Sequence, residues 1–318
     1  MDRPPQLSGS SYYPPDKMIF PTYNNGPSVL REAAKARRKP AVWAQILIFA
    51  GLYFLILIVI QGIPMILVNV MRGLPLDSFR EREWSANFWL LLPTLAYMAY
   101  VKFIEKRSLY SMGFVRRHAL RQYAIGALSG VAMMSVVVGI CMLTGTMEYE
   151  GVAMTASSSV ILLWLGGFLV QGMHEEVICR GYLMVSLANR TAVVWAILIN
   201  SLLFSAIHLF NPEVGVLPLA NLVLYGVFAS IYFLRTNNIW GVAANHSLWN
   251  FTQGNLFGMP VSGMGFDETV FSFRPVDGYE IVNGGAFGVE GGIVTTIVYA
   301  IGILLVILLT RRKQKLPL

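Results

Sequence analysis

Charged residues are scarce in this sequence. Only 13% of its 318 residues are Asp, Glu, Lys or Arg, against about 25% in a typical soluble domain, and 55% are hydrophobic. This composition excludes an ordinary soluble enzyme and predicts an all-α polytopic membrane protein. A net charge of +7 would suit nucleic acid binding, but membrane orientation explains the surplus, as shown below. We therefore expect no nucleic acid partner.

Cysteine is also rare. Cys141 and Cys179 both lie in apolar runs, which favours packed thiols over a disulfide or a metal pair. About forty mostly polar residues precede the first apolar run, so no cleavable signal peptide is expected. Residues 1–41 contain seven prolines and end in a basic run. We predict a disordered basic cytoplasmic tail that becomes a short basic helix near the membrane surface.

Apolar runs long enough to cross a bilayer follow this tail. They lie at about residues 43–71, 86–104, 123–145, 159–186, 193–210, 215–234, 239–256 and 291–310. With eight spans, nineteen Lys and Arg fall on the N-terminal side of the membrane and four on the other, while Arg180 lies within a span. The positive-inside rule then places both termini in the cytoplasm. The predicted organisation is a transmembrane domain over 42–310, followed by a basic cytoplasmic tail at 311–318.

Two connecting segments stand out. Residues 105–121 alternate apolar and basic positions, which predicts an amphipathic interfacial helix with Arg116, Arg117 and Arg121 toward lipid phosphates. The external segment 257–290 is rich in glycine and is expected to cover part of a site without supplying chemistry.

The fourth apolar run carries three charges, Glu175, Glu176 and Arg180. Each charge near the middle of a membrane helix costs roughly 2.5 to 3.5 kcal/mol, so three together indicate a functional site. Glu176 and Arg180 are four residues apart on one helix face and can neutralise each other. Glu175 is turned away from that pair and is free to face another group.

The sequence has only four histidines, and three of them, His174, His208 and His246, fall within apolar runs. A single buried histidine is usually a structural residue, and His174 is given that interpretation. His208 follows Phe204 by four residues, and Asn250 follows His246 by four, so each pair shares a helix face. Several such pairs in one chain favour a common site.

The expected depths of these residues agree only in part. Glu175 and Glu176 lie about sixteen residues before the turn at 190–192 and His208 about sixteen after it, so an antiparallel hairpin places them at one depth. His246 comes only eight or nine residues after the turn at 236–238. The difference, roughly 10 Å along the axis, requires a tilted helix or a fourth and fifth span that project into the cytosol.

This set of side chains suits hydrolysis by activated water. A carboxylate can act as general base, one imidazole can hold the water, and a second imidazole with an amide can stabilise an oxyanion. Alternatively, His208, His246 and a glutamate could hold zinc, with water as the fourth ligand. The common HExxH zinc signature is absent, since Ile178 occupies its second histidine position.

These residues resemble the three motifs of the CPBP family of intramembrane proteases, which includes the type II CAAX prenyl proteases and bacterial bacteriocin-processing or immunity homologues. Its EExxxR motif reads here as Glu175, Glu176 and Arg180, its FxxxH motif as Phe204 and His208, and its HxxxN motif as His246 and Asn250. The resemblance covers about residues 115–255. The run GGAFGVEGG at 284–292 is also similar to a segment of bacterial members.

The resemblance implies an endopeptidase that cuts a membrane-anchored peptide or protein in the lipid bilayer. It also implies a multi-pass protein of the bacterial cell membrane. Glu175 and His208 would activate water, His246 and Asn250 would stabilise the oxyanion, and Glu176, Arg180 and Phe204 would orient the site or bind substrate. The family is commonly labelled as metalloprotease, and zinc stays an open alternative to a metal-free glutamate mechanism.

 A non-catalytic scaffold or immunity factor of the same fold, and a proton-coupled transporter, are the rival interpretations. No internal repeat supports a transporter. Candidate substrates are a prenylated CAAX peptide, a bacteriocin leader and a membrane-anchored signalling peptide, of which the bacterial resemblance favours the latter two.

Overall fold

The computed structural model describes residues 28–54 and 84–311. This part of the chain is mostly helical, as the composition predicts. Four of its helical segments are long and apolar enough to cross a membrane: Ala86–Glu105, Ala119–Leu143, Val216–Thr236 and Ile293–Thr310. The apolar helices Val42–Phe54 and Val193–Ala206 are shorter. The second half of the first expected span, and the tails at 1–27 and 312–318, lie outside the described residues.

The N-terminal part of the described chain packs against the middle of the sequence. Helix α1 (Ser28–Ala33) buries Val29, Leu30 and Ala33. The description resumes with α4 (Trp84–Trp89), α5 (Leu91–Ala99) and a π-helical turn at Tyr100–Glu105. The interfacial helix expected over 105–121 is wrong: the chain forms only a 3-10 turn, Leu109–Met112, before α6 begins at Ala119. Gly113 and His118 adopt left-handed backbone conformations there, which interrupt a helix.

The central helices follow the apolar runs closely. Their bounds are α6 (Ala119–Leu143), α7 (Ser158–Glu176), a π-helix (Val177–Met184), α8 (Val185–Ala188), α9 (Val193–Ala206), α10 (Val216–Thr236), α11 (Ile239–Phe251), a π-helix (Thr252–Leu256) and α13 (Ile293–Arg311). Both turns expected from the sequence are confirmed, between α8 and α9 and between α10 and α11. At the second turn Asn237 has a φ of 52°, and the Asn238 side chain accepts a hydrogen bond from the Trp240 amide at 2.9 Å.

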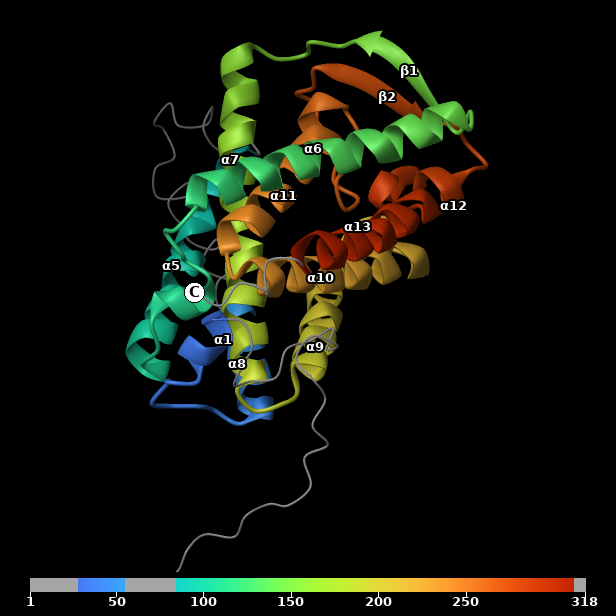
Figure 1. Cartoon of the computed structure of the whole chain (residues 1–318). Helices are drawn as coiled ribbons and strands as arrows, with labels where there is room; N and C mark the ends of the chain where they lie inside the picture. Colours follow the sequence, from blue (N-terminus) through green and yellow to red (C-terminus); the bar gives the residue numbers. More distant parts are fainter. Residues whose placement is uncertain (1–27, 55–83, 312–318) are drawn as a thin grey trace, which may run out of the picture.

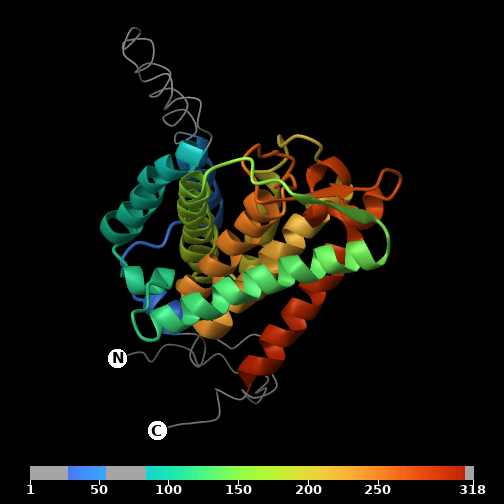
Figure 2. The ribbon, with the colours of Figure 1, turned by 90° about the horizontal axis from the view of Figure 1, so that it is seen from above.

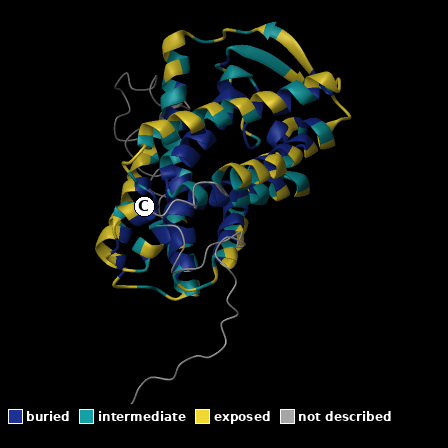
Figure 3. Cartoon of the chain, viewed as in Figure 1, coloured by how far each residue is buried: buried dark blue, intermediate teal, exposed yellow. Residues whose placement is uncertain are grey.

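The helices are not a set of parallel rods. In Figure 1, α6 and α10 lie across α7, and in Figure 2, where α7 is seen nearly end-on, α6 runs crosswise beside it. Buried residues gather along the lower part of α7, α8 and α11, while the outer side of α6 is exposed (Figure 3). Helix α11 is therefore surrounded by protein, although hydropathy makes it the weakest of the expected spans.

Close contacts between small residues allow α11 to lie against both α6 and α7. A Cβ atom on Gly126 of α6 would lie 1.9 Å from the carbonyl oxygen of Gly241, and one on Gly172 of α7 would lie 2.7 Å from the amide nitrogen of Ser247. Such approach of two backbones is typical of small residues at helix contacts in membranes. It brings His246 next to the helix that carries the two glutamates.

The segment between α11 and α13 folds over one end of this helical core. Strand β2 (Phe271–Pro275) pairs antiparallel with β1 (Met147–Val152), with Met147 opposite Pro275 and an irregularity between Tyr149 and Gly151. Helix α12 (Glu280–Asn283) and 3-10 turns at Gly285–Phe287 and Val289–Gly291 lead to α13. Figure 1 shows the two strands above α6 and α13.

Candidate active site

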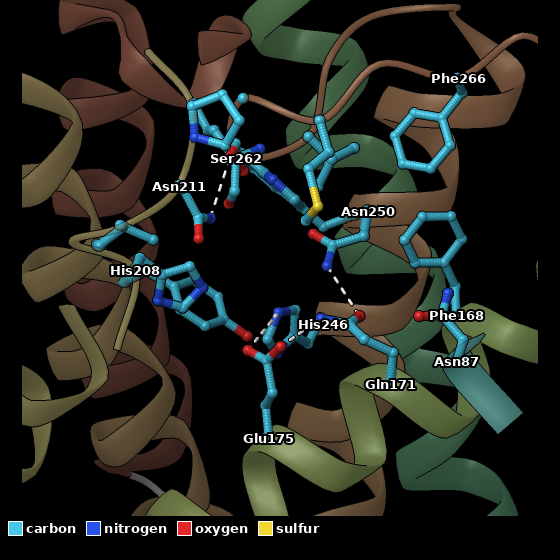
Figure 4. Close-up of a pocket in the computed structure, with 18 of the residues that line it drawn as sticks. Asn87, Phe168, Gln171, Glu175, His208, Asn211, His246, Asn250, Ser262 and Phe266 are labelled. Atoms are coloured by element: carbon cyan, nitrogen blue, oxygen red, sulfur yellow. Dashed lines mark hydrogen bonds and ion pairs between the residues drawn. The ribbon is translucent and has the colours of Figure 1, made fainter. Parts of the chain in front are cut away.

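A cavity of about 550 Å³ lies between α7, α9, α10, α11 and the segment after α11. The motif residues that line it are Glu175, Phe204, His208, His246 and Asn250. Figure 4 shows Glu175 at its base, with His208 on one side and Asn250 on the other. Residues that are 75 positions apart in the sequence thus face a common space.

Glu175 is held by a short chain of hydrogen bonds. Its Oε1 atom accepts a hydrogen bond from Gln171 Nε2 at 2.5 Å, and Gln171 Oε1 accepts one from Asn250 Nδ2 at 3.0 Å. Its Oε2 atom has no hydrogen-bond partner in the described protein and lies 3.7 Å from His246 Nε2. Gln171 was missed by sequence reasoning, although its position four residues before Glu175 on the same helix face was a usable signal.

Glu176 and Arg180 lie behind the cavity wall. Both side chains are fully buried, and Arg180 Nη1 donates to Glu176 Oε1 at 3.1 Å. The guanidinium carbon also lies 4.7 Å from the centre of the Phe204 ring and 5.5 Å from that of Tyr225, which are cation–π distances. The pair is therefore neutralised within the helical core, and its role toward the cavity is indirect.

His246 joins the two glutamates. Its Nδ1 atom lies 2.9 Å from Glu176 Oε1, which also accepts a hydrogen bond from the Tyr225 hydroxyl at 3.2 Å. Because a carboxylate accepts only, Nδ1 carries the proton, and Nε2 is directed to Glu175. The depth difference expected from counting residues is removed by the crossing of α11 over α7, since axial counting assumes parallel helices.

His208 lies just beyond the last residue of α9. Its Nδ1 atom is 2.8 Å from the carbonyl oxygen of Phe204 and donates to it, which leaves Nε2 as an acceptor toward the cavity. The Phe204 and His208 ring centres are 5.0 Å apart. Phe204 therefore fixes the imidazole by a backbone hydrogen bond and by ring contact.

His174 lies on a different side of α7. Its side chain is buried, and its Nδ1 atom is 2.9 Å from the Thr94 hydroxyl of α5. It does not line the cavity. This agrees with its interpretation as a structural histidine.

π-Helical turns follow the motif positions on both site helices. One spans Val177–Met184 directly after the two glutamates, and the other spans Thr252–Leu256 directly after Asn250. Such turns widen a helix locally and are frequent at functional sites. No pattern in the sequence predicts these turns.

Zinc is the alternative to a metal-free mechanism at this cavity. Across the described residues, no group of three or more His, Cys, Asp and Glu side chains is arranged to hold a metal. The Nδ1 atoms of His208 and His246 bond to protein acceptors and Glu176 pairs with Arg180, so the Nε2 atoms and Glu175 are the groups that face the cavity. We derive no step through a metal.

The comparison with protein families agrees with this geometry. The model described as type II CAAX prenyl endopeptidase Rce1-like matches residues 157–252, the stretch that carries all three motifs. This stretch of the chain is therefore similar to the type II CAAX prenyl endopeptidases of the CPBP family. No curated protein and no solved structure matches it. Together with the four long apolar helices, this similarity indicates an integral membrane protein.

The segment after α11 supplies the cavity residues that sequence reasoning missed altogether. Val261, Ser262, Gly263, Met264 and Phe266 line one side, and Glu290 lines the same cavity from the turn before α13. Glu290 is thus a further carboxylate at the cavity, in a segment in which the sequence indicated no chemistry. Its place within GGAFGVEGG was a signal that could have identified it.

Proposed function

We propose that this protein is an intramembrane endopeptidase that hydrolyses a peptide bond of a membrane-associated peptide or protein. The observation that supports it is the single cavity shared by Glu175, His208, His246 and Asn250. Peptide hydrolysis needs a base for water and donors for the developing oxyanion, and these four side chains supply both.

In this mechanism Glu175 is the general base. Its Oε2 atom, which lacks a hydrogen-bond partner, accepts the proton of a water molecule that His208 positions through Nε2. The hydroxide attacks the substrate carbonyl carbon and forms a tetrahedral intermediate. Glu175 then returns the proton to the leaving amine, so that protons balance over the cycle.

His246 and Asn250 stabilise the oxyanion of that intermediate. In its protonated form the Nε2 atom of His246 donates, and the Asn250 amide supplies a second donor once it releases Gln171. Glu176, with Arg180 behind it, fixes the His246 ring and favours its protonated form, as a buried carboxylate does for an adjacent imidazole. Phe204 holds His208 and the Arg180 guanidinium.

We also propose that eight helices cross the membrane and that both termini face the cytoplasm. The distribution of Lys and Arg among the connecting segments supports this arrangement. The first of the eight includes residues 55–71, which lie outside the described residues.

The function is tested by cleavage of a membrane-peptide library with purified protein in detergent. Glu175→Gln and His208→Ala should each lower the rate by about a hundredfold or more, the usual effect of removing a general base or its partner. His174→Ala is the matched control, because this histidine is on the same helix as Glu175 but does not line the cavity. A zinc chelator is included in a parallel set.

Each outcome has a distinct meaning. Loss of cleavage in both variants, at an unchanged folded yield, supports the endopeptidase, and activity that survives the chelator supports the metal-free mechanism. Equal behaviour of wild type and variants would instead favour a non-catalytic scaffold or immunity factor.

A further inference from the structure

The carboxylate of Glu290 is the feature of the cavity that the proposed mechanism does not use. The residue is 7% exposed, comes from the 3-10 turn Val289–Gly291, and lines the same cavity as Glu175. Its backbone is fixed, because Asn221 of α10 donates to the carbonyl oxygens of Glu290 and Gly292 at 2.8 and 2.9 Å. The side chain is thus held in place at the cavity wall.

One oxygen of this carboxylate is held by Ser262. Oε1 accepts hydrogen bonds from the Ser262 amide and, at 2.7 Å, from the Ser262 hydroxyl. Neither of these bonds involves Oε2, and Trp249 is the other side chain within hydrogen-bonding reach of the carboxylate. Ser262 itself is positioned by Asn211, which donates to its carbonyl oxygen at 3.0 Å, and Figure 4 shows both residues across the cavity from Glu175.

The carboxylate of Glu290 forms no ion pair with a lysine or arginine at the cavity, and His208 is the titratable side chain that acts on its charge. No lysine or arginine lines the cavity. Glu175, by contrast, has Gln171 and His246 as neighbours. Burial raises the pKa of Glu290, and the hydrogen bonds from Ser262 only partly offset this. A buried charge without a partner is costly, which suggests that its counter-charge arrives from outside.

Aromatic rings next to Glu290 also favour a positively charged group at this position. Trp249 and Tyr299 line the cavity with their ring centres 5.0 Å apart, and Tyr299 is within electrostatic reach of the carboxylate. A carboxylate beside aromatic faces attracts ammonium and guanidinium groups by charge and by cation–π interaction.

We propose that Glu290 is a specificity-determining residue that binds a positively charged group of the substrate near the bond to be cut. The group is the side chain of a lysine or arginine or a free amino terminus. The inference rests on the proposed endopeptidase function for its catalytic consequence, but it makes a separate claim about binding.

Matched peptides test this specificity. Internally quenched membrane peptides carry Lys, Gln or Glu in turn at each position flanking the cleaved bond, each with a free or an acetylated amino terminus. The wild type should cleave the preferred Lys peptide at least about tenfold more efficiently than its Gln counterpart, a modest effect for a charge-assisted contact. If the group bound is the amino terminus, acetylation should lower cleavage, and exchanging Lys for Gln should have no effect.

Glu290→Gln isolates the charge, because the amide oxygen can still accept both hydrogen bonds from Ser262. This variant should reduce the Lys-to-Gln ratio, or the free-to-acetylated ratio, to about one, mainly through KM. Glu268→Gln is the matched control: Glu268 belongs to the same segment, accepts a hydrogen bond from Trp164 Nε1 at 3.2 Å and does not line the cavity. It should keep the wild-type ratio. An equal loss on all peptides in Glu290→Gln would show that the residue only supports Ser262, and would overturn the proposal.

A binding measurement separates this inference from the proposed function. Fluorescence anisotropy with the same peptides compares Glu175→Gln with the double variant Glu175→Gln/Glu290→Gln. One outcome is that the wild type cleaves no peptide, while the cationic peptide binds more tightly than its neutral counterpart and does so only while Glu290 is present. In that case the binding claim stands and the proposed endopeptidase function is wrong. If peptides are cleaved and neither rate nor affinity depends on their charge, the endopeptidase stands and the binding claim is wrong.

Discussion

The Nδ1 atom of His246 lies 2.9 Å from Oε1 of Glu176, so the second glutamate of the motif holds the ring whose other nitrogen faces the first. Two adjacent carboxylates thus have different surroundings. Glu176 is enclosed with Arg180 and Tyr225, whereas Glu175 lines the cavity. This division of environment is the basis of the division of roles proposed above.

Removing the charge of Glu176 should cost both stability and activity. Glu176→Gln leaves the Arg180 guanidinium buried without a counter-charge, which costs about 3 to 5 kcal/mol when one partner of a buried pair is lost. It also replaces the charged acceptor of His246 Nδ1 by a neutral amide oxygen, which no longer stabilises a protonated imidazole, so cleavage should fall together with stability. Thermal unfolding in detergent and the peptide assay measure the two effects.

The double variant Glu176→Gln/Arg180→Met is the control for this prediction. Removal of both charges should recover much of the stability, since the unpaired cation is gone. Cleavage should stay low, because His246 still lacks the carboxylate charge beside its Nδ1 atom. Recovery of activity along with stability would mean that Glu176 acts only as the partner of Arg180.

The contact between α6 and α11 should be sensitive to a single methyl group. In Gly126→Ala the new Cβ atom would lie 1.9 Å from the Gly241 carbonyl oxygen, so α11 must shift and carry His246 with it. We expect a lower unfolding temperature and at least tenfold slower cleavage, in line with the effect of small displacements on catalytic geometry. Gly139→Ala on the same helix is the matched control, because a Cβ atom there meets nothing within 4 Å. Equal effects of both substitutions would contradict the close-packing argument.

The stability contribution of Glu290 should depend on pH. Burial raises its pKa above 4.5, against the opposing charge of His208 from the end of α9. Because the folded state then holds this proton more tightly than the unfolded state, folding becomes less favourable as pH rises from 4.5 through the raised pKa. Glu290→Gln should therefore unfold at a higher temperature than the wild type near pH 8, and the difference should vanish below pH 4.5.

Thermal unfolding in detergent across this pH range measures whether Glu290→Gln unfolds at a higher temperature than the wild type at high pH. Asp277→Asn, which removes an exposed carboxylate of the same segment, corrects for the loss of one negative charge. A wild type that is more stable than Glu290→Gln at high pH would contradict the assignment of an unpaired buried carboxylate.

The proposed orientation can be tested with single cysteines. Cys141 and Cys179 are buried, so the native protein should react slowly with a membrane-impermeant maleimide. Asp277→Cys should be labelled on intact cells, and Arg117→Cys only after the membrane is opened, because both positions are exposed but lie on opposite sides of the proposed arrangement. Labelling of Arg117→Cys on intact cells would reject the eight-span topology with cytoplasmic termini.

The sequence by itself determined the helical membrane class, the position of the helices and the three motifs. Apolar runs of 18 or more residues have few alternatives to helix, because backbone groups in a bilayer must be satisfied internally. Spacings of four residues place side chains on one helix face wherever the helix lies. For these reasons Glu176 and Arg180, Phe204 and His208, and His246 and Asn250 could be paired without a structure.

Only the tertiary structure decided how these pairs meet. The depth of His246 depends on the angle at which α11 crosses α7, and that angle is set by contacts such as Gly172 with Ser247 rather than by any local spacing. The role of Glu290 depends on a glycine-rich segment that returns to the cavity after α11, and the position of such a segment follows from packing, not from periodicity. Local patterns specify faces and lengths, whereas crossing angles and returning loops arise only when the whole chain packs.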